Sequence, residues 1–128
     1  MNRSLLIQFF LLVIFLAIMI SPVSASENKA YHLALLAVQD LGDHLEGSDA
    51  DLYLELKEGS GRVFLATHPL TKIATQISTR FAKDIACKHF KLNCDKYDFI
   101  FTINADSSII GGPSAGAAIA SMTTIAVM

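Results

Sequence analysis

The stretch GGPSAG at residues 111–116 combines the residue types that acyl-transfer chemistry needs around a serine. A serine hydroxyl becomes a nucleophile when a base takes its proton, and backbone N–H groups stabilise the negative charge that develops on an attacked carbonyl oxygen. Gly111 and Gly112 allow a substrate to approach the backbone closely, and Pro113 stiffens the turn. Ser114 is therefore a candidate nucleophile, and the backbone of Gly111, Gly112 and Pro113 is a candidate oxyanion site.

Two other interpretations of these six residues stay open. Serine is a favoured N-cap, so Ser114 would then only begin the helix that the following small residues predict. The free N–H groups at the N-terminus of a helix also bind phosphate, so the stretch would then be a phosphate-binding loop. The six residues alone favour the helix cap.

Three segments are predicted from their local composition. Residues 31–38, YHLALLAV, are apolar and short enough for a buried strand. Residues 40–51 mix glycine with carboxylates and are predicted to form an acidic loop. Residues 98–104, DFIFTIN, are rich in β-branched and aromatic residues, which predicts a strand that leads into the loop of Ser114. The backbone of that strand is a candidate for aligning a peptide substrate.

An alternating pattern follows the acidic segment. Leu52, Leu54 and Leu56 share one face of a predicted strand, and polar residues occupy the other face. The turn residues EGSG and the apolar run RVFLAT come next, which predicts a β-hairpin over residues 51–67.

The segment after the hairpin has helical periodicity. Its large apolar residues recur at spacings of three and four, which predicts an amphipathic helix with one apolar stripe, and Pro69 suits the first helical turn. The stripe consists of Leu70, Ile73, Ile77, Phe81 and Ile85. Together with the strands, this helix and the helix that starts at Ser114 predict an α+β domain with a mixed sheet, a hairpin and packed helices.

The first 25 residues have the pattern of an export signal. Arg3 precedes an apolar run at residues 5–20, and small residues at Val23 and Ala25 suit cleavage after Ala25. A retained membrane anchor is the alternative. In both cases residues 26–128 form a single domain outside the cytoplasm, either secreted or anchored to the membrane.

Charge and cysteine usage narrow the class of partner and site. Residues 26–128 carry all twelve carboxylates and all of the ten basic residues except Arg3, without a basic motif, which argues against nucleic acid as a partner. Cys87 and Cys94 lie in the exported part, where they are predicted to form a disulfide. No CxxC pair and no short histidine spacing occurs, so we predict no metal site, and no cofactor.

With its preceding strand and ADSSII segment, GGPSAG resembles the serine region of the Lon-type proteolytic domain. Members of that family carry Pro-Ser-Ala-Gly at the start of a helix, and the order of strand, hairpin and long helix upstream is similar over residues 31–128. The resemblance implies an α+β fold and a serine endopeptidase that uses a Ser–Lys dyad, with Ser114 as nucleophile. Its substrates would be peptides or unfolded proteins, and oligomerisation stays open. Because the chain has no GxxxxGK[ST] loop, we expect it to work without ATP.

Two departures from the family pattern leave an alternative open. Gly111 stands where many members have aspartate, and the family's lysine lies several dozen residues after the serine, which places it beyond residue 128. Residues 114–128 also end in an apolar helical run, so we expect 26–128 to be the N-terminal portion of the peptidase domain. The last lysine, Lys96, lies upstream on a polar connector, where it should stay charged and solvated.

Other bases and folds have weaker support. The four histidines, of which His68 lies between a strand and a helix, are better explained by turn or capping roles. The alternative function is therefore a non-catalytic exported or membrane-tethered domain that retains the peptidase scaffold. A phosphate-binding domain similar to the galactokinase and homoserine kinase group fits GGPSAG poorly, because that group has a longer Gly-Leu-Gly-Ser-Ser-Ala loop.

Overall fold

The computed structural model describes residues 3, 7–10, 12 and 30–128. The predicted cleavage position after Ala25 and most of the apolar run at 5–20 lie outside these residues. Within the described part, no helix is long and apolar enough to cross a membrane. The fold from residue 30 onward is α+β, with a mixed four-stranded sheet and two packed helices.

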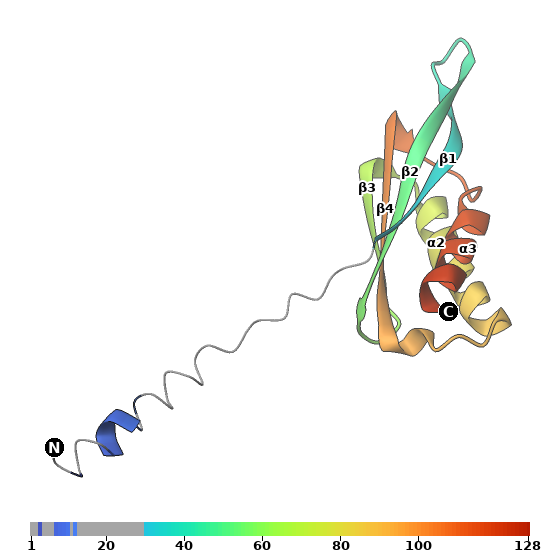
Figure 1. The fold of residues 1–128 in the computed structure, drawn as a ribbon. Helices are drawn as coiled ribbons and strands as arrows, with labels where there is room; N and C mark the ends of the chain where they lie inside the picture. The colour runs from blue at the N-terminus through green and yellow to red at the C-terminus, as the bar shows by residue number, and fades with distance from the viewer. Residues whose placement is uncertain (1–2, 4–6, 11, 13–29) are drawn as a thin grey trace.

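The elements follow one another as three strands, a helix, a short 3₁₀ turn, a strand and a helix. Their bounds are β1 Ala30–Asp40, β2 Leu45–Glu58, β3 Val63–Thr71, α2 Ile73–His89, η1 Cys94–Lys96, β4 Tyr97–Ile110 and α3 Gly116–Val127. Figure 1 shows two layers, with α2 and α3 together on one side of the twisted sheet. The other side of the sheet has no covering layer among the described residues.

The sheet has the order β1-β2-β4-β3, and this order overturns the predicted hairpin of residues 51–67. β1 and β4 both pair with β2 in antiparallel fashion, and β3 pairs with β4 in parallel. β4 therefore lies between the two strands that were expected to pair with each other. Local alternation reports which face of a strand is buried, but it carries no information about the neighbouring strand.

The predicted acidic loop at residues 40–51 is also wrong for most of its length. Only residues 41–44 form a turn, closed by a hydrogen bond from the Leu41 N–H to the His44 carbonyl at 3.1 Å. Residues 45–50 continue β2 and pair with residues 35–40 of β1. The carboxylates of Glu46 and Asp49 are exposed, so the hairpin that β1 and β2 form here holds these charges in solvent.

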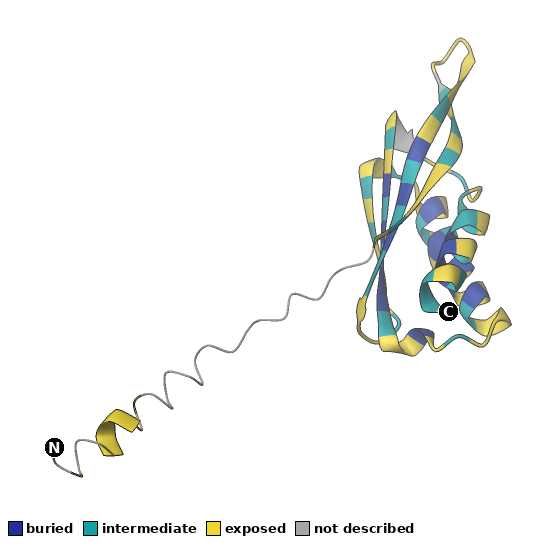
Figure 2. Ribbon diagram, in the orientation of Figure 1, coloured by how far each residue is buried: buried dark blue, intermediate teal, exposed yellow. Residues whose placement is uncertain are grey.

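The alternation of leucines in β2 is confirmed as a buried face. Leu52 and Leu54 are fully buried, whereas Lys57 is exposed. Phe99 and Phe101 of β4 lie on the same face and are also fully buried, and both α3 and α2 contribute to this core. Figure 2 shows the buried residues gathered between the sheet and the helices.

Helix α2 presents its small and polar residues to the core, and its apolar stripe faces solvent. Ile73, Ile77 and Phe81 are 72, 62 and 64 % exposed. An apolar stripe of this kind normally faces the core. Here the buried positions are Thr75, Thr79, Ala82, Lys83 and Ala86.

The local reason is close packing between the two helices. The small side chains of Ala82 and Ala86 let α2 approach α3, and a Cβ atom added at Gly116 would meet the Cβ of Ala82 at 3.9 Å. The Thr79 hydroxyl donates to the Thr75 carbonyl at 2.8 Å, so its burial leaves no polar group without a partner. The helix begins at Ile73, and Pro69 and Leu70 belong to β3 instead of its first turn.

A disulfide joins Cys87 and Cys94, the pair predicted from the sequence. Their Cα atoms are 6.0 Å apart, within the range that a disulfide requires. The bond ties the last turn of α2 to η1, and Cys94 is buried against the core. This end of the domain is therefore covalently closed where β4 begins.

Candidate active site

The loop at residues 111–115 carries Ser114 from the end of β4 to the start of α3. Gly112 has a positive φ of 100°, a conformation that residues with a side chain rarely adopt. The Pro113 carbonyl then accepts a hydrogen bond from the Gly116 N–H at 3.0 Å, which closes a turn around Ser114. The glycine at 112 is therefore required for the direction in which the chain reaches Ser114.

Ser114 is not the N-cap of α3, so the helix-cap interpretation is wrong. The N-cap position is Ala115, and no side chain caps the helix. Ser114 is exposed, and its hydroxyl has no hydrogen-bond partner within the described part of the chain. A capping serine would accept a bond from a backbone N–H two or three residues later. The hydroxyl is instead left free.

Helix α2 supports this loop from the side. The buried Thr75 hydroxyl donates a hydrogen bond of 3.3 Å to the Gly112 carbonyl. The aliphatic stem of Lys72 lies against Gly111, since a Cβ atom added there would be 2.7 Å from the lysine Cδ. Sequence reasoning missed both contacts, because Thr75 and Lys72 lie far upstream of the loop. The signal for Thr75 was a polar residue on the small-residue face of a helix.

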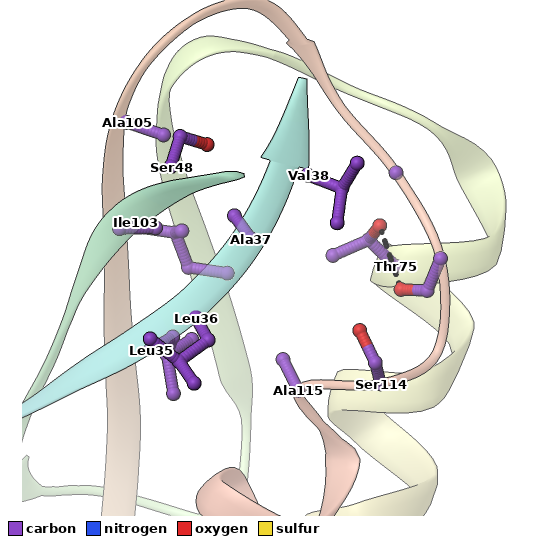
Figure 3. Close-up of a pocket in the computed structure, with 13 residues that line it drawn as sticks. Leu35, Leu36, Ala37, Val38, Ser48, Thr75, Ile103, Ala105, Ser114 and Ala115 are labelled. Carbon is purple, nitrogen blue, oxygen red and sulfur yellow. Dashed lines mark hydrogen bonds between the residues drawn. The ribbon is translucent and has the colours of Figure 1, made fainter. Parts of the chain in front are cut away.

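A pocket of about 500 Å³ opens beside the serine loop. One wall is Leu35–Val38 of β1, another is the loop with Gly111, Gly112, Ser114 and Ala115, and Thr75 lies between them. Ile103 and Ala105 of β4 and Ser48 and Ala50 of β2 form the floor. Figure 3 shows the Ser114 hydroxyl on the same side of the loop as Thr75, facing this space.

The pocket runs along the edge of the sheet. Side chains of successive strand residues point to opposite faces, so four consecutive residues of β1 line one pocket only when it meets the strand edgewise. β1 is an edge strand in the described sheet, whereas β4 is flanked by β2 and β3. Residues 99–104 of the strand before Ser114 are paired on both sides, but residues 106–110 have no β2 partner in the described sheet, so alignment of a substrate by this strand stays a prediction. β1, as an edge strand of the described sheet, also has an outer edge at the pocket.

Backbone donors lie next to the serine hydroxyl. The N–H groups of Ser114 and Ala115 donate to no acceptor within residues 30–128. Pro113 has no N–H and Gly111 lies further from the helix, so of the loop residues predicted for an oxyanion only Gly112 has a donor close to Ser114. The positive end of the α3 dipole reinforces these amides.

None of the described lysines is placed as a buried base for Ser114. Lys83 is buried, but its Nζ donates to the Gly61 carbonyl at 2.9 Å and to Asp84 at 3.2 Å. Gly61 lies where β4 begins, while the pocket lies where β4 ends. Lys96 is exposed on η1, and Lys72 is exposed beside Gly111.

The histidines also lie away from the serine loop. His32 pairs with Asp51 at 2.6 Å on the exposed side of β1 and β2, and His44 pairs with Asp43 in the turn at residues 41–44. His68 is an exposed residue of β3, opposite Asn104, and not a helix cap. No group of three metal-ligating side chains occurs among the described residues.

Among the described residues, the one carboxylate with a strongly perturbed pKa belongs to the scaffold. The Asp98 side chain accepts hydrogen bonds from the Arg62 side chain and from the N–H groups of Ser60 and Arg62. These bonds, with the Arg62 side chain first among them, lower the pKa of Asp98 from 3.8 to about 2. Asp98 lies near the start of β4, at the end opposite Ser114, and fixes the loop between β2 and β3.

No protein-family model and no curated protein matches this chain. The geometry around Ser114 therefore carries the functional argument.

Proposed function

We propose that this chain carries the serine portion of an exported, ATP-independent Lon-type serine endopeptidase, in which Ser114 is the nucleophile. The single observation that carries the proposal is an exposed Ser114 hydroxyl that has no partner among the described residues, at a pocket of about 500 Å³ beside a strand edge. A nucleophilic serine needs such an accessible hydroxyl, whereas a serine that caps a helix would use its hydroxyl as a hydrogen-bond acceptor.

The proposed reaction is acyl transfer to the serine. Ser114 Oγ attacks the carbonyl carbon of a peptide bond, and the N–H groups of Ser114, Ala115 or Gly112 stabilise the resulting oxyanion. A lysine that lies beyond residue 128 takes the hydroxyl proton and passes it to the leaving amine. Water then hydrolyses the acyl-enzyme and restores the hydroxyl.

The shape of the pocket supports an extended peptide as substrate. The outer edge of β1 at residues 35–38 can pair with a peptide strand, and the neighbouring pocket accommodates a side chain. Its lining by Leu35, Val38 and Ile103 favours an apolar side chain at this position. Folded proteins do not present such a strand, so the proposal concerns peptides and unfolded chains.

One observation favours a second candidate, a non-catalytic exported domain that retains this scaffold. Lys72, whose stem lies against Gly111, is exposed, so none of the lysines described within residues 30–128 is a buried base beside Ser114. In that case the pocket would bind a peptide without cleaving it.

The test is covalent labelling by a fluorophosphonate probe. The protein is expressed from the coding DNA with the reading frame that follows codon 128, so that the lysine is present. We expect the probe to label this protein and the Ser48→Ala variant, because Ser48 lines the same pocket but lies on strand β2 and not at the start of a helix. The Ser114→Ala variant should not be labelled.

The result can go against the proposal in two ways. Labelling that survives in Ser114→Ala, or a folded protein that never reacts, would exclude Ser114 as the nucleophile. A frame that ends at codon 128, together with a protein that binds peptides but does not cleave them, would establish the non-catalytic domain.

A further inference from the structure

The solvent side of α2 is an apolar ridge, which we call the outer face of α2 and define by Ile73, Ile77, Phe81 and Ile85. These residues are spaced by four, so they lie along one line on the helix. Their side chains are 72, 62, 64 and 47 % exposed. Phe90, just after the helix, is 54 % exposed as well.

An exposed ridge of this kind has no role in the described fold. Small residues and threonines already form the buried side of α2, and α3 packs on that side. Burying large apolar side chains stabilises a structure, so leaving these four largely exposed forgoes that gain. Contiguous exposed apolar surface is typical of a site that contacts a partner.

The charge around the ridge identifies the class of partner. Residues 70–91 contain five of the ten basic residues of the chain but only one of its twelve carboxylates. Lys83 is buried, and the four exposed cations Lys72, Arg80, Lys88 and Lys91 accompany the single carboxylate Asp84. The rest of the chain is strongly acidic, so positive charge is concentrated where the apolar ridge lies.

This combination disfavours a second copy of the chain as the occupant. Two outer faces brought together would oppose four exposed cations to four others, with only one carboxylate on each side to compensate. An anionic surface reverses this balance, because it attracts each exposed Lys and Arg. A helix face with apolar side chains flanked by cations is also the pattern of interfacial membrane helices.

We propose that the outer face of α2 lies on an anionic phospholipid surface. Ile73, Ile77, Phe81 and Ile85 enter the boundary between head groups and acyl chains, and Arg80, Lys88 and Lys91 contact the phosphates. The uncovered face of the sheet then points away from the membrane, because the helices occupy the other side. The inference stands on the surface of α2 and does not depend on Ser114.

The chain contains no tryptophan, so one introduced tryptophan reports on one site. Phe81→Trp places it in the centre of the ridge. Phe64→Trp is the matched control, because Phe64 is also an exposed phenylalanine, at 46 %, but lies on the opposite face of the sheet. Phe64 is paired with Ile100, whereas its neighbours face the core beside Phe99 and Phe101.

The experiment measures quenching of each tryptophan by brominated acyl chains. Both full-length variants are mixed with vesicles of phosphatidylglycerol and phosphatidylcholine. We expect a blue shift and quenching for Trp at position 81 and neither change at position 64. Residues 5–20 are identical in both variants, so a tether formed by them cannot produce this difference.

A charge variant tests the electrostatic part in the Phe81→Trp background. Arg80→Glu, Lys88→Glu and Lys91→Glu together should weaken the binding to anionic vesicles, followed by quenching at position 81, by about a hundredfold or more, as the loss of about 1 kcal/mol per cation implies. Vesicles of phosphatidylcholine alone should have the same effect on the parent variant. Far-UV circular dichroism checks that each variant is folded.

Three results would overturn the proposal. The first is a vesicle-bound protein whose tryptophan at position 81 is not quenched. The second is equal quenching at positions 64 and 81, which would mean contact without a preferred face. The third is a blue shift at position 81 that appears without vesicles and grows with protein concentration, which would make a second copy the occupant.

Discussion

The hydroxyl of Thr75 donates a hydrogen bond of 3.3 Å to the carbonyl oxygen of Gly112, across 37 residues of sequence. This bond joins the first turn of α2 to the loop that holds Ser114. Because Thr75 is buried and Gly112 has a positive φ, the bond fixes the loop at its most constrained residue. The position of the serine therefore depends on a helix that contributes no reactive group.

Thr75→Val should destabilise the domain by about 1 kcal/mol, because it keeps the shape of the side chain but leaves the Gly112 carbonyl without its donor. Urea unfolding measures the loss. Thr79→Val is the matched control, since the Thr79 hydroxyl bonds only within its own helix. Amide hydrogen exchange at residues 111–115 should accelerate in Thr75→Val and stay unchanged in Thr79→Val. Equal exchange in both variants would show that the bond does not hold the loop.

Gly112→Ala should cost about 1–2 kcal/mol, because an alanine with a φ of 100° is strained even though nothing lies within 4 Å of the added Cβ. Gly111→Ala brings its Cβ to 2.7 Å from the Lys72 stem, yet an exposed flexible side chain can move aside. We therefore expect Gly111→Ala to change the free energy of unfolding by only a few tenths of a kcal/mol. Urea denaturation of the two variants, measured side by side, compares their losses of stability. A larger loss in Gly111→Ala than in Gly112→Ala would mean that crowding by Lys72 outweighs backbone strain.

The disulfide closes a short loop between α2 and η1. On the chain-entropy model, its loss should destabilise the domain by about 2–3 kcal/mol, because the unfolded chain regains freedom. The Cys87→Ala and Cys94→Ala double variant should therefore unfold at lower urea concentration than the oxidised parent. Addition of a reductant should lower the urea midpoint of the parent and leave the urea midpoint of the double variant unchanged. A reductant effect on the double variant would point to a cause other than this bond.

The sequence predicts individual elements of the fold well where the pattern is local. The alternation of Leu52 and Leu54 identifies a buried strand face, and the β-branched run at 98–104 identifies β4. The hairpin at 51–67 is wrong because strand pairing depends on contacts between distant residues, such as Asp98 with the N–H groups of Ser60 and Arg62. Those bonds turn the chain past the start of β4 instead of back along β2.

The candidate site is predictable only in part for a related reason. GGPSAG marks the loop, but the residue that supports it, Thr75, belongs to a helix whose apolar periodicity points the wrong way. A hydrophobic pattern identifies the face of a helix that is shielded from water, but it does not tell whether the protein core or another surface covers that face. If a lipid surface covers Phe81, the pattern is correct for the assembled system and misleading for the isolated domain.

The last prediction concerns acid stability, and it depends on Asp98. Its pKa is lowered to about 2 in the folded state, chiefly by the hydrogen bonds from the Arg62 side chain. A carboxylate with a depressed pKa stabilises the fold above its ordinary pKa of 3.8, and this contribution is lost as pH falls toward 2. The urea midpoint of the parent should therefore drop between pH 4 and pH 2. Asp98→Asn should be less stable than the parent at pH 7 and should lose much less stability in that interval. The exposed Asp49→Asn variant should follow the parent throughout, and a parallel fall in Asp98→Asn would assign the acid sensitivity to other carboxylates.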